Sequence, residues 1–323
     1  DVGIKEWYGK NDGTLPTAGE LNPDLLVAAI GRILGIDPPE VSEAYRDKLR
    51  ALTAAVPKRE QTFCPGCPHR ASFWSIREAL QRDHRRGFVC GDIGCYAMAS
   101  LFPAAGFHTS KTLHSMGSGT GIASGFGKLG PFGMEQPVLA VCGDSTFYHA
   151  AIPALINAVH QRADITFIAL DNSGTAMTGF QPHPGIDVNA MGEKTPMVDI
   201  AALCGATGAP VVTCDPFDLT KTRETLNRLL EERGVKVLIL KQSCALSPEK
   251  KGKKQFHVRV DEALCRGDAC GCNRLCTRIF RCPGLLWNRE RKKAEIDEVI
   301  CAGCGFCAAI CPAGAIRKEE ASA

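Results

Sequence analysis

Residues 137–174, PVLAVCGDSTFYHAAIPALINAVHQRADITFIALDNSG, decide the fold of the central part of this chain. Two apolar runs of strand length, 137–141 and 165–170, flank a helical pattern at 150–160. Strands without charged residues are typical of parallel sheets that are buried on both faces. The order of strand, helix and strand therefore predicts part of a doubly wound α/β domain with a parallel sheet.

The same alternation continues beyond this stretch. A third apolar run at 235–240 follows a helical pattern at 219–232. We therefore expect one doubly wound α/β domain over residues 59–248. A small α+β domain should follow over residues 255–323, where the composition changes and many of the cysteines gather.

The opening of the chain differs from both of these regions. It is rich in Gly, Asn and Pro, and then Asn22 as N-cap with Pro23 at the first helical position predicts a helix to about Leu34. We interpret residues 1–58 as a linker and helical segment from a preceding domain. The chain begins with Asp1, so we expect that domain to have been removed or to be encoded separately.

The C-terminal segment carries a cysteine run at 301–312 with the spacing C-x2-C-x2-C-x3-C-P, as in bacterial ferredoxins. In this spacing three thiolates hold one [4Fe–4S] cluster and the fourth reaches a second cluster. An upstream Cys-Pro pair repeats the ending of the run, so its thiolate should cross to the downstream cluster. The expected ligands of that cluster are Cys282, Cys301, Cys304 and Cys307.

The second cluster takes Cys311 and three ligands from an upstream group with the unusual spacing C-x4-C-x-C-x3-C. We favour Cys276 and Cys272, while Cys265 and Cys270 compete for the remaining position. The alternative is a zinc ribbon or a disulfide framework, although structural zinc prefers two separated C-x2-C pairs. Two neighbouring clusters predict a path for single electrons.

Composition favours a cytoplasmic, anaerobic redox protein. The chain has 17 Cys in 323 residues, and a core of this size needs no disulfides, so the thiols are better explained as metal ligands. No leader and no apolar stretch of about 20 residues is present, so we expect no membrane association. The 38 basic and 35 acidic residues are dispersed and give a net charge of +3, which provides no argument for a nucleic-acid partner.

Polar residues stand where the two central apolar runs end. Two short motifs, 25 residues apart, follow these runs: Gly143-Asp144-Ser145 and Asp171-Asn172-Ser173-Gly174. The carboxyl ends of parallel strands form the edge at which such sheets bind ligands. A carboxylate, an amide oxygen and a backbone carbonyl suit Mg²⁺, which can in turn hold a diphosphate. The alternative is an ordinary strand–helix–strand unit with polar tips.

Three motifs in a fixed order carry a resemblance to a known family. They are Cys64-Pro-Gly-Cys67-Pro-His69-Arg70, Gly91-Asp92-Ile-Gly94-Cys95-Tyr96 and the polar pair at the strand ends. Together they resemble the 2-oxoacid:ferredoxin oxidoreductases, most closely the indolepyruvate branch, and the polar pair resembles the thiamine diphosphate motif. Ser145 replaces the second Gly of that motif and Asp171 its first Asn, but the metal-ligand positions are kept. The resemblance covers nearly this whole chain and the rear half of the family's alpha subunit.

The resemblance implies a thiamine diphosphate and Mg²⁺ site in the α/β domain. The implied Mg²⁺ ligands are Asp144, Asn172 and the carbonyl of Gly174. The other implied cofactor-binding residues are Gly91, Asp92, Gly94, Met116, Gly117, Gly143 and Ser145. His69 and His114 are the candidate catalytic groups, for proton transfer or carboxylate binding, and a hydrogen-bonded structural role is the alternative for either. The loop at 178–184 is expected to cover the diphosphate or to shape the acyl pocket.

The resemblance also implies a third [4Fe–4S] cluster close to the cofactor. Its ligands by position in the family pattern are Cys64, Cys67, Cys95 and Cys244. The remaining cysteines fit no ligand spacing, and we interpret them as buried structural thiols: Cys90, Cys142, Cys204 and Cys214.

The activity implied by the resemblance is oxidative decarboxylation of a 2-oxoacid with coenzyme A to acyl-CoA and CO₂, with electrons passing to ferredoxin. Indolepyruvate or another aryl pyruvate is the expected substrate, and phenylglyoxylate and branched-chain acids remain open. The implied partners are a polypeptide with the pyrimidine-binding domain and a beta- or gamma-type subunit, in a hetero-oligomer. The alternatives are an electron-transfer iron–sulfur subunit without thiamine chemistry and a non-redox thiamine decarboxylase.

Overall fold

The computed structural model describes residues 6–37, 41–56, 61–100, 107–271 and 273–321. Contacts within the chain divide it into two units, Asp1–Arg59 and Glu60–Ala323. All candidate site residues from the sequence belong to the second unit. Within the described ranges, no helix combines the length and the apolar character that a membrane span requires.

The first unit contains two helices, α1 (Pro23–Leu34) and α2 (Glu43–Ala55). The side chain of Asn22 accepts a hydrogen bond from the N–H of Leu25 at 3.0 Å, and Pro23 occupies the first turn of α1. Gly35 follows the helix in the left-handed conformation, which glycine adopts without strain. The predicted start and end of this helix are therefore confirmed.

The second unit is built on a six-stranded sheet in which every strand pairing is parallel. The strand order is β2-β1-β3-β4-β6-β5, with bounds β1 (Phe88–Cys90), β2 (Ser110–Thr112), β3 (Val138–Gly143), β4 (Ile165–Asp171), β5 (Val211–Cys214) and β6 (Val235–Lys241). Every residue of β3 and β4 is buried, as their uncharged sequences predict. The predicted parallel α/β sheet is confirmed.

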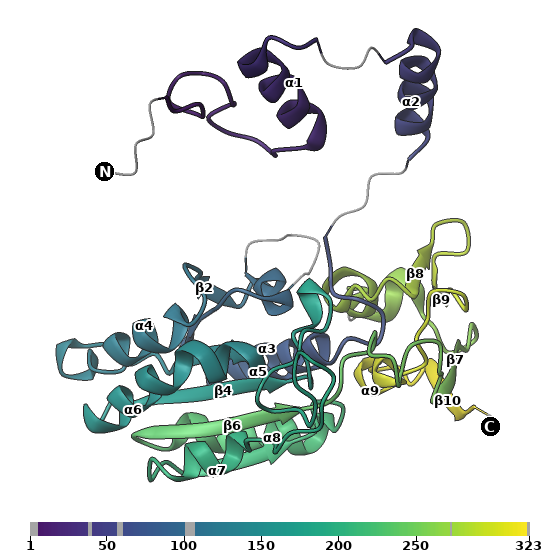
Figure 1. Cartoon of the computed structure of the whole chain (residues 1–323). Coiled ribbons are helices and arrows are strands. Elements are labelled where there is room, and N and C mark those ends of the chain that lie inside the picture. The colour runs from purple at the N-terminus through teal and green to yellow at the C-terminus, as the bar shows by residue number, and fades with distance from the viewer. Residues whose placement is uncertain (1–5, 38–40, 57–60, 101–106, 272, 322–323) are drawn as a thin grey trace. The chain divides into compact units, whose positions relative to one another are not determined.

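Two separate cores lie on the two faces of this sheet, because alternate residues of each strand point to opposite sides. One core packs the strands against α3 (Pro68–Asp83) and α8 (Leu219–Glu231). The other packs them against α4 (Ser118–Phe126), α6 (Ile152–His160) and α7 (Ile200–Gly205). The sheet thus lies between two helical layers (Figure 1), and the edge at the carboxyl ends of its strands is left for a ligand.

Short turns connect these elements near that edge. β3 leads directly into α5 (Asp144–Thr146), the π-helical turn η4 (Phe147–Ala151) and then α6. A π-helical turn inside a helix is often found at a functional site. The 3₁₀ turns of this domain are η1 (Cys95–Ala99), η3 (Gly130–Phe132) and η5 (Ala176–Thr178).

A small domain with two short antiparallel sheets follows the parallel sheet. β7 (Phe256–Val260) pairs with β10 (Ile316–Glu320), and β8 (Leu285–Asn288) pairs with β9 (Lys293–Ile296). The remaining elements are η6 (Gly267–Cys270), η7 (Cys276–Phe280) and α9 (Phe306–Ile310). This arrangement confirms the predicted small α+β domain.

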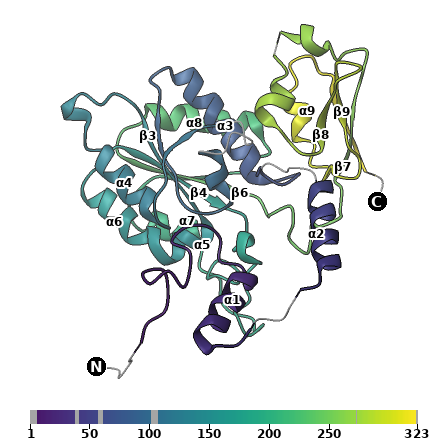
Figure 2. The ribbon, with the colours of Figure 1, turned by 90° about the horizontal axis from the view of Figure 1, so that it is seen from above.

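The small domain and the sheet domain share one hydrophobic core. The ring of Phe280 meets Trp74 of α3 edge-on at 5.7 Å and stacks on Phe306 of α9 at 5.7 Å, measured between ring centroids. Seen from above, α9 and β8 lie beside the end of α3 (Figure 2). The cysteine-rich segment is therefore packed against the α3 side of the sheet domain.

A cysteine-bearing turn of the sheet domain touches a cysteine-bearing turn of the small domain. Gly66 lies between Cys64 and Cys67 with φ of 71°, and a Cβ placed on it would lie 2.8 Å from the Cβ of Ala302 and 3.8 Å from that of Cys304. The two turns can approach so closely because Gly66 has no side chain.

Replacing Gly66 by Ala is expected to weaken this contact. The substitution gives a side chain a left-handed φ, which costs about 1–3 kcal/mol, and it places a Cβ against Ala302. The thermal midpoint of the iron-loaded protein, measured anaerobically, should fall more than that of Gly208→Ala. Gly208 is the matched control because it has φ of 83° with open space around it. Equal losses would show that crowding at Gly66 has no cost.

Candidate active site and cysteine sets

A cavity opens at the carboxyl ends of β3 and β4. It collects many of the predicted site residues: the candidate catalytic group His69, the predicted cluster ligand Cys95, and the predicted cofactor-binding residues Gly94, Met116, Gly143, Asp144, Ser145, Asn172 and Gly174. Ile93, Tyr96, Thr146 and Met177 complete much of its wall. The residues come from α3, the turn before η1, the segment before α4 and the tips of two strands, so the fold rather than the sequence brings them together.

Asp144 is fixed by backbone hydrogen bonds at the centre of this edge. Its Oδ1 accepts from the N–H of Ser145 at 2.8 Å, and its Oδ2 accepts from the N–H groups of Asn172 and Gly174 at 3.2 Å each. The carboxylate is only 3% exposed. These contacts join the tips of β3 and β4, which the sequence predicted to meet.

The predicted Mg²⁺ ligands lie within hydrogen-bond distance of one another. With its amide oriented to satisfy both ends, Asn172 donates from Nδ2 to the carbonyl of Gly174 at 2.7 Å and to Asp144 Oδ2 at 3.3 Å. The amide NH₂ group thus lies between a carboxylate and a carbonyl, in the place where a cation would be bound. If the amide rotates so that its oxygen points to this place, the three groups offer three oxygen ligands, which Mg²⁺ prefers.

His69 lies beside this group in a buried position. Its Nε2 is 3.2 Å from the amide of Asn172, and its ring meets Tyr96 edge-on at 5.6 Å. Burial lowers the pKa of His69 to about 4, although the charge of Asp144 opposes this change. The ring is therefore neutral near pH 7, so it can exchange hydrogen bonds but offers no charge to a substrate carboxylate.

The structure does not bring His114 to the cavity. His114 is exposed in the segment before α4 and is not among the described residues that line this wall. Gly91, Asp92 and Gly117 lie behind the wall instead. Asp92 is buried, and its Oδ1 accepts from the N–H groups of Ile93 and Gly117 at 2.7 and 2.8 Å. These three residues hold the turns that place Cys95 and Met116.

His183 is a site residue that the sequence reasoning did not name. Its Nε2 lies 3.3 Å from Asp144 Oδ2, and its ring stacks on Tyr148 with centroids 5.5 Å apart. Its Nδ1 accepts from the N–H of Gly185 at 3.0 Å, so a proton on this ring lies on the nitrogen that faces Asp144. The sequence signal was a histidine between two prolines in the loop at 178–184, which we expected near the diphosphate.

The four cysteines predicted to hold the cluster near the cofactor lie near one another, and one of them, Cys95, lines this cavity. Burial raises the pKa of Cys95 to about 11, and the thiols of Cys64 and Cys244 raise it further. Burial raises the pKa of Cys67 to about 12, with a smaller contribution from Cys64. We call Cys64, Cys67, Cys95 and Cys244 the proximal set. The N–H of Cys244 also donates to the carbonyl of Asn172 at 3.0 Å.

A second group of thiols lies in the small domain. Burial raises the pKa of Cys307, and the thiols of Cys304, Cys282 and Cys301 raise it further. These four residues, which we call the middle set, are the ligands predicted from the crossing of the Cys-Pro pairs. A Cβ placed on Gly284, two residues after Cys282, would lie 3.2 Å from the Cβ of Cys301, so the two cysteine runs meet in the fold.

A third group lines a separate small cavity. Cys265, Cys270, Cys276 and Cys311 face it together with Trp287. These four form the outer set, which matches the prediction that Cys311 crosses to the upstream cysteines. Cys272, one of the two favoured upstream ligands, lies outside the described residues.

The chemistry of these sets suits iron–sulfur clusters. The described cysteines form no disulfides, and a thiol must lose its proton to bind metal. Among the described residues, no three Cys, His, Asp or Glu side chains form a group that could hold a single metal ion. The predicted sites do not require such a group. The predicted Mg²⁺ site contains a single carboxylate, and a four-iron cluster binds each thiolate at a separate iron atom.

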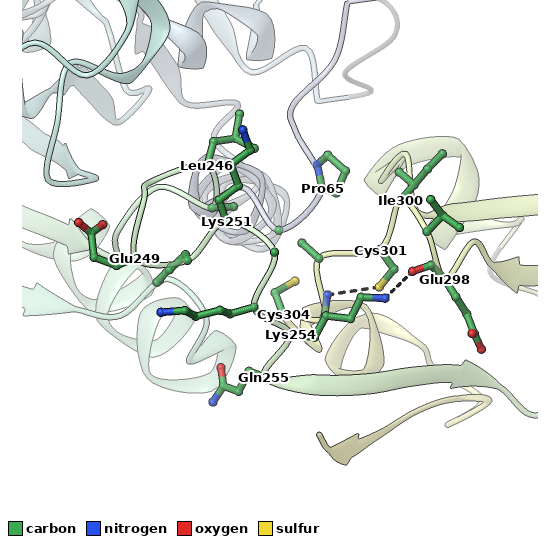
Figure 3. Close-up of a pocket in the computed structure, with 18 of the residues that line it drawn as sticks. Pro65, Leu246, Glu249, Lys251, Lys254, Gln255, Glu298, Ile300, Cys301 and Cys304 are labelled. Atoms are coloured by element: carbon green, nitrogen blue, oxygen red, sulfur yellow. Dashed lines mark hydrogen bonds between the residues drawn. The ribbon is translucent and has the colours of Figure 1, made fainter. Parts of the chain in front are cut away.

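A larger cavity of about 600 Å³ lies beside the middle set. Figure 3 shows Lys254 beside Cys301 and Cys304, with Lys251 and Glu249 also among the residues around the cavity. The Nζ of Lys254 donates to the carbonyl of Glu298, and the Sγ of Cys301 accepts from the N–H of Gly303 at 3.4 Å. The basic segment 249–254 thus lies against the turn that carries the middle set.

Comparisons with known proteins agree with these two kinds of site. The family described as thiamine pyrophosphate enzyme, C-terminal TPP binding domain, matches residues 92–240, and the 4Fe-4S binding domain family matches residues 293–316. The indolepyruvate oxidoreductase subunit IorA of Methanothermobacter marburgensis is 38% identical over 324 residues, which are 99% of this chain and 48% of the relative. This chain is a homologue of the IorA subunits.

A second IorA subunit matches this chain to a similar extent. The IorA subunit of Pyrococcus horikoshii is 35% identical over 329 residues, 97% of this chain and 48% of the relative. The IorA homologue described here therefore spans about half the length of the curated relatives it matches. A solved 2-oxoglutarate:ferredoxin oxidoreductase from Magnetococcus marinus has 17% identity and a TM-score of 0.47, covering 58% of this chain and 65% of that chain.

Removing one thiol of the proximal set tests whether that set holds iron in this IorA homologue. Three four-iron clusters give about 12 iron atoms per chain, and Cys95→Ala should leave about 8 because one cube loses a corner ligand. The measurement is iron and acid-labile sulfide content after anaerobic purification. Cys204→Ala is the control, because Cys204 is fully buried in the other core and should keep all the iron. Unchanged iron in Cys95→Ala would remove Cys95 as a ligand.

Proposed function

We propose that this IorA homologue carries the diphosphate-binding part and the electron path of a thiamine diphosphate-dependent 2-oxoacid:ferredoxin oxidoreductase. The reaction is the oxidative decarboxylation of a 2-oxoacid with coenzyme A to acyl-CoA and CO₂. When bound, thiamine diphosphate supplies the nucleophilic carbon and the electron sink that decarboxylation requires. The observation that carries the proposal is that Cys95 lines the same cavity as Asp144 and Asn172.

The cavity residues have distinct parts in this proposal. Asp144, Asn172 and the carbonyl of Gly174 hold Mg²⁺ and through it the diphosphate, because they are the oxygen donors that converge on the sheet edge. His183 lies against Asp144 and keeps that carboxylate oriented. The neutral ring of His69 exchanges a hydrogen bond at the amide of Asn172. Together they fix the diphosphate end of the cofactor.

The rest of the wall supports an aryl pyruvate, and indolepyruvate in particular, as the proposed substrate. Ile93, Met116 and Met177 line the cavity with apolar or thioether groups, which suit an aromatic side chain. The printed name of the relatives is that of an indolepyruvate oxidoreductase, which agrees with this choice.

The three cysteine sets form the proposed electron path. The proximal set reaches the cavity through Cys95, and its turn touches the middle set at Gly66 and Ala302. Cys282 comes from the upstream cysteine run but belongs to the middle set, and Cys311 comes from the downstream run but belongs to the outer set. These two residues therefore connect the middle and outer sets. We propose ferredoxin as the acceptor beyond the outer set.

The proposal requires other polypeptides. A domain that binds the pyrimidine end of the cofactor and a beta- or gamma-type subunit would complete the assembly as a hetero-oligomer. The cytoplasm is the proposed compartment, since it keeps cysteine thiols reduced and available for iron. The other candidate, an electron-transfer subunit without thiamine chemistry, would not require the oxygen donors at the tips of β3 and β4.

Substituting Asp144 separates these two functions. Asp144→Asn removes the central carboxylate, so Mg²⁺-dependent binding of thiamine diphosphate to the complete oxidoreductase should weaken by more than about tenfold, or 1.4 kcal/mol. Binding is measured by calorimetric titration. Asp171→Asn is the matched control at the tip of β4, where it restores the amide of the usual motif and removes only an ion pair with Lys241 at 3.3 Å. Absence of Mg²⁺-dependent binding in the unsubstituted protein would favour the electron-transfer candidate.

A further inference from the structure

Arg70 is buried at the junction of the two domains. It stands on the first turn of α3, three residues after Cys67, and only 1% of it is exposed. Its Nη1 donates to the carbonyls of Phe280 and Arg281, and its Nη2 donates to the carbonyl of Phe63. The guanidinium group therefore connects Phe63, which precedes Cys64, with Arg281, which precedes Cys282, through hydrogen bonds.

The positive charge of Arg70 has no carboxylate partner among the described residues. Its hydrogen bonds go to backbone carbonyls and to the hydroxyl of Thr62 at 3.4 Å, and its Nε is buried without a hydrogen bond. A guanidinium group stays charged in proteins, and a buried charge is costly unless an opposite charge compensates it. The compensating charge must therefore come from another kind of group.

Cysteines of two sets can supply it once they bind iron as thiolates, because Arg70 donates to the carbonyls of the residues that precede Cys64 and Cys282. Burial lowers the pKa of Arg70, and the thiols of Cys282, Cys67, Cys64 and Cys304 raise it again. The first and last of these belong to the middle set and the other two to the proximal set. The rings of Phe63 and Phe280, each 5.5 Å from the guanidinium carbon, flank the charge and keep it from water.

Cys282 receives several groups that favour its thiolate. Arg70 Nη1 donates at 2.9 Å to the carbonyl of Arg281, which directly precedes Cys282, and the charge of Arg70 and the N–H groups of Gly284 and Gly66 act on the thiol of Cys282. Arg70 and Gly66 both belong to the sheet domain, so the domain that carries the proximal set also stabilises negative charge on the middle set.

We propose that Arg70 is the shared counter-charge of the proximal and middle cysteine sets and raises the reduction potentials of the clusters that they hold. This inference rests on the proposed function, since it requires clusters at both sets. Each reduction adds one negative charge, and a fixed positive charge in a poorly polarisable interior stabilises the reduced form. Because one guanidinium serves both sets, its removal should lower both potentials together.

The test is a potentiometric titration of the full-length protein with its partner subunits, followed by EPR. In Arg70→Gln the equilibrium constant for reduction should fall about tenfold at the proximal and middle clusters, which is about 59 mV for one electron. The outer cluster should change much less, because no thiol of the outer set is among the charges that act on Arg70. Arg70→Lys keeps the charge and should retain potentials within about threefold in that constant, or about 28 mV.

Arg77→Gln is the matched control from the same helix. Arg77 donates to Gln81 at 3.1 Å and has no cysteine among the charges that act on it, so this variant should leave all three potentials unchanged. Unchanged proximal and middle potentials in an iron-replete Arg70→Gln protein would overturn the inference. So would an equal fall in Arg70→Lys and Arg70→Gln.

Iron content distinguishes the remaining outcomes. If Arg70→Gln fails to retain iron, Arg70→Lys is the deciding variant. Normal iron content and potentials in Arg70→Lys would support the role of Arg70 as a counter-charge. Loss of iron in both variants would show that the shape of the guanidinium group is required, and would overturn the inference. If the unsubstituted protein lacks iron at the proximal or middle set, the proposed function fails before the charge of Arg70 is tested.

Discussion

The contact between Gly66 and Ala302 is the constraint on which the rest of this structure depends. Electron transfer weakens steeply with distance, so cysteine sets on two domains can form one path only where their supporting turns touch. The glycine permits that approach, and the aromatic packing of Phe280 against α3 and α9 maintains it. The sheet domain and the small domain therefore share one packed core, and the proposed electron path depends on it.

The parallel sheet could be predicted from the sequence because its central strands are buried on both faces. The runs at 137–141 and 165–170 carry no charge, and the structure places them in β3 and β4. The short strands β1 and β2, of three residues each, gave no such signal because they are too brief to show a pattern. Cysteine spacing also predicted how the thiols of the small domain divide into two groups, which stays a prediction for the cluster ligands, and it left the choice among Cys265, Cys270, Cys272 and Cys276 open.

The site was only partly predictable, because its remaining members depend on contacts between distant segments. Arg70 and Phe280 are 210 positions apart, and neither spacing nor composition relates them. His183 reaches Asp144 only through the course of the loop at 178–184. His114 illustrates the opposite case. The sequence made it a candidate catalytic group, whereas the structure exposes it away from the described wall of the cavity.

The hydrogen bond from Cys244 to the carbonyl of Asn172 has a consequence for maturation of the protein. Under the proposed function, this bond joins the residue that offers an amide to the diphosphate site to a residue that offers a thiol to iron. Assembly of either site would then help to order the other, because a shift of the Cys244 backbone also shifts Asn172.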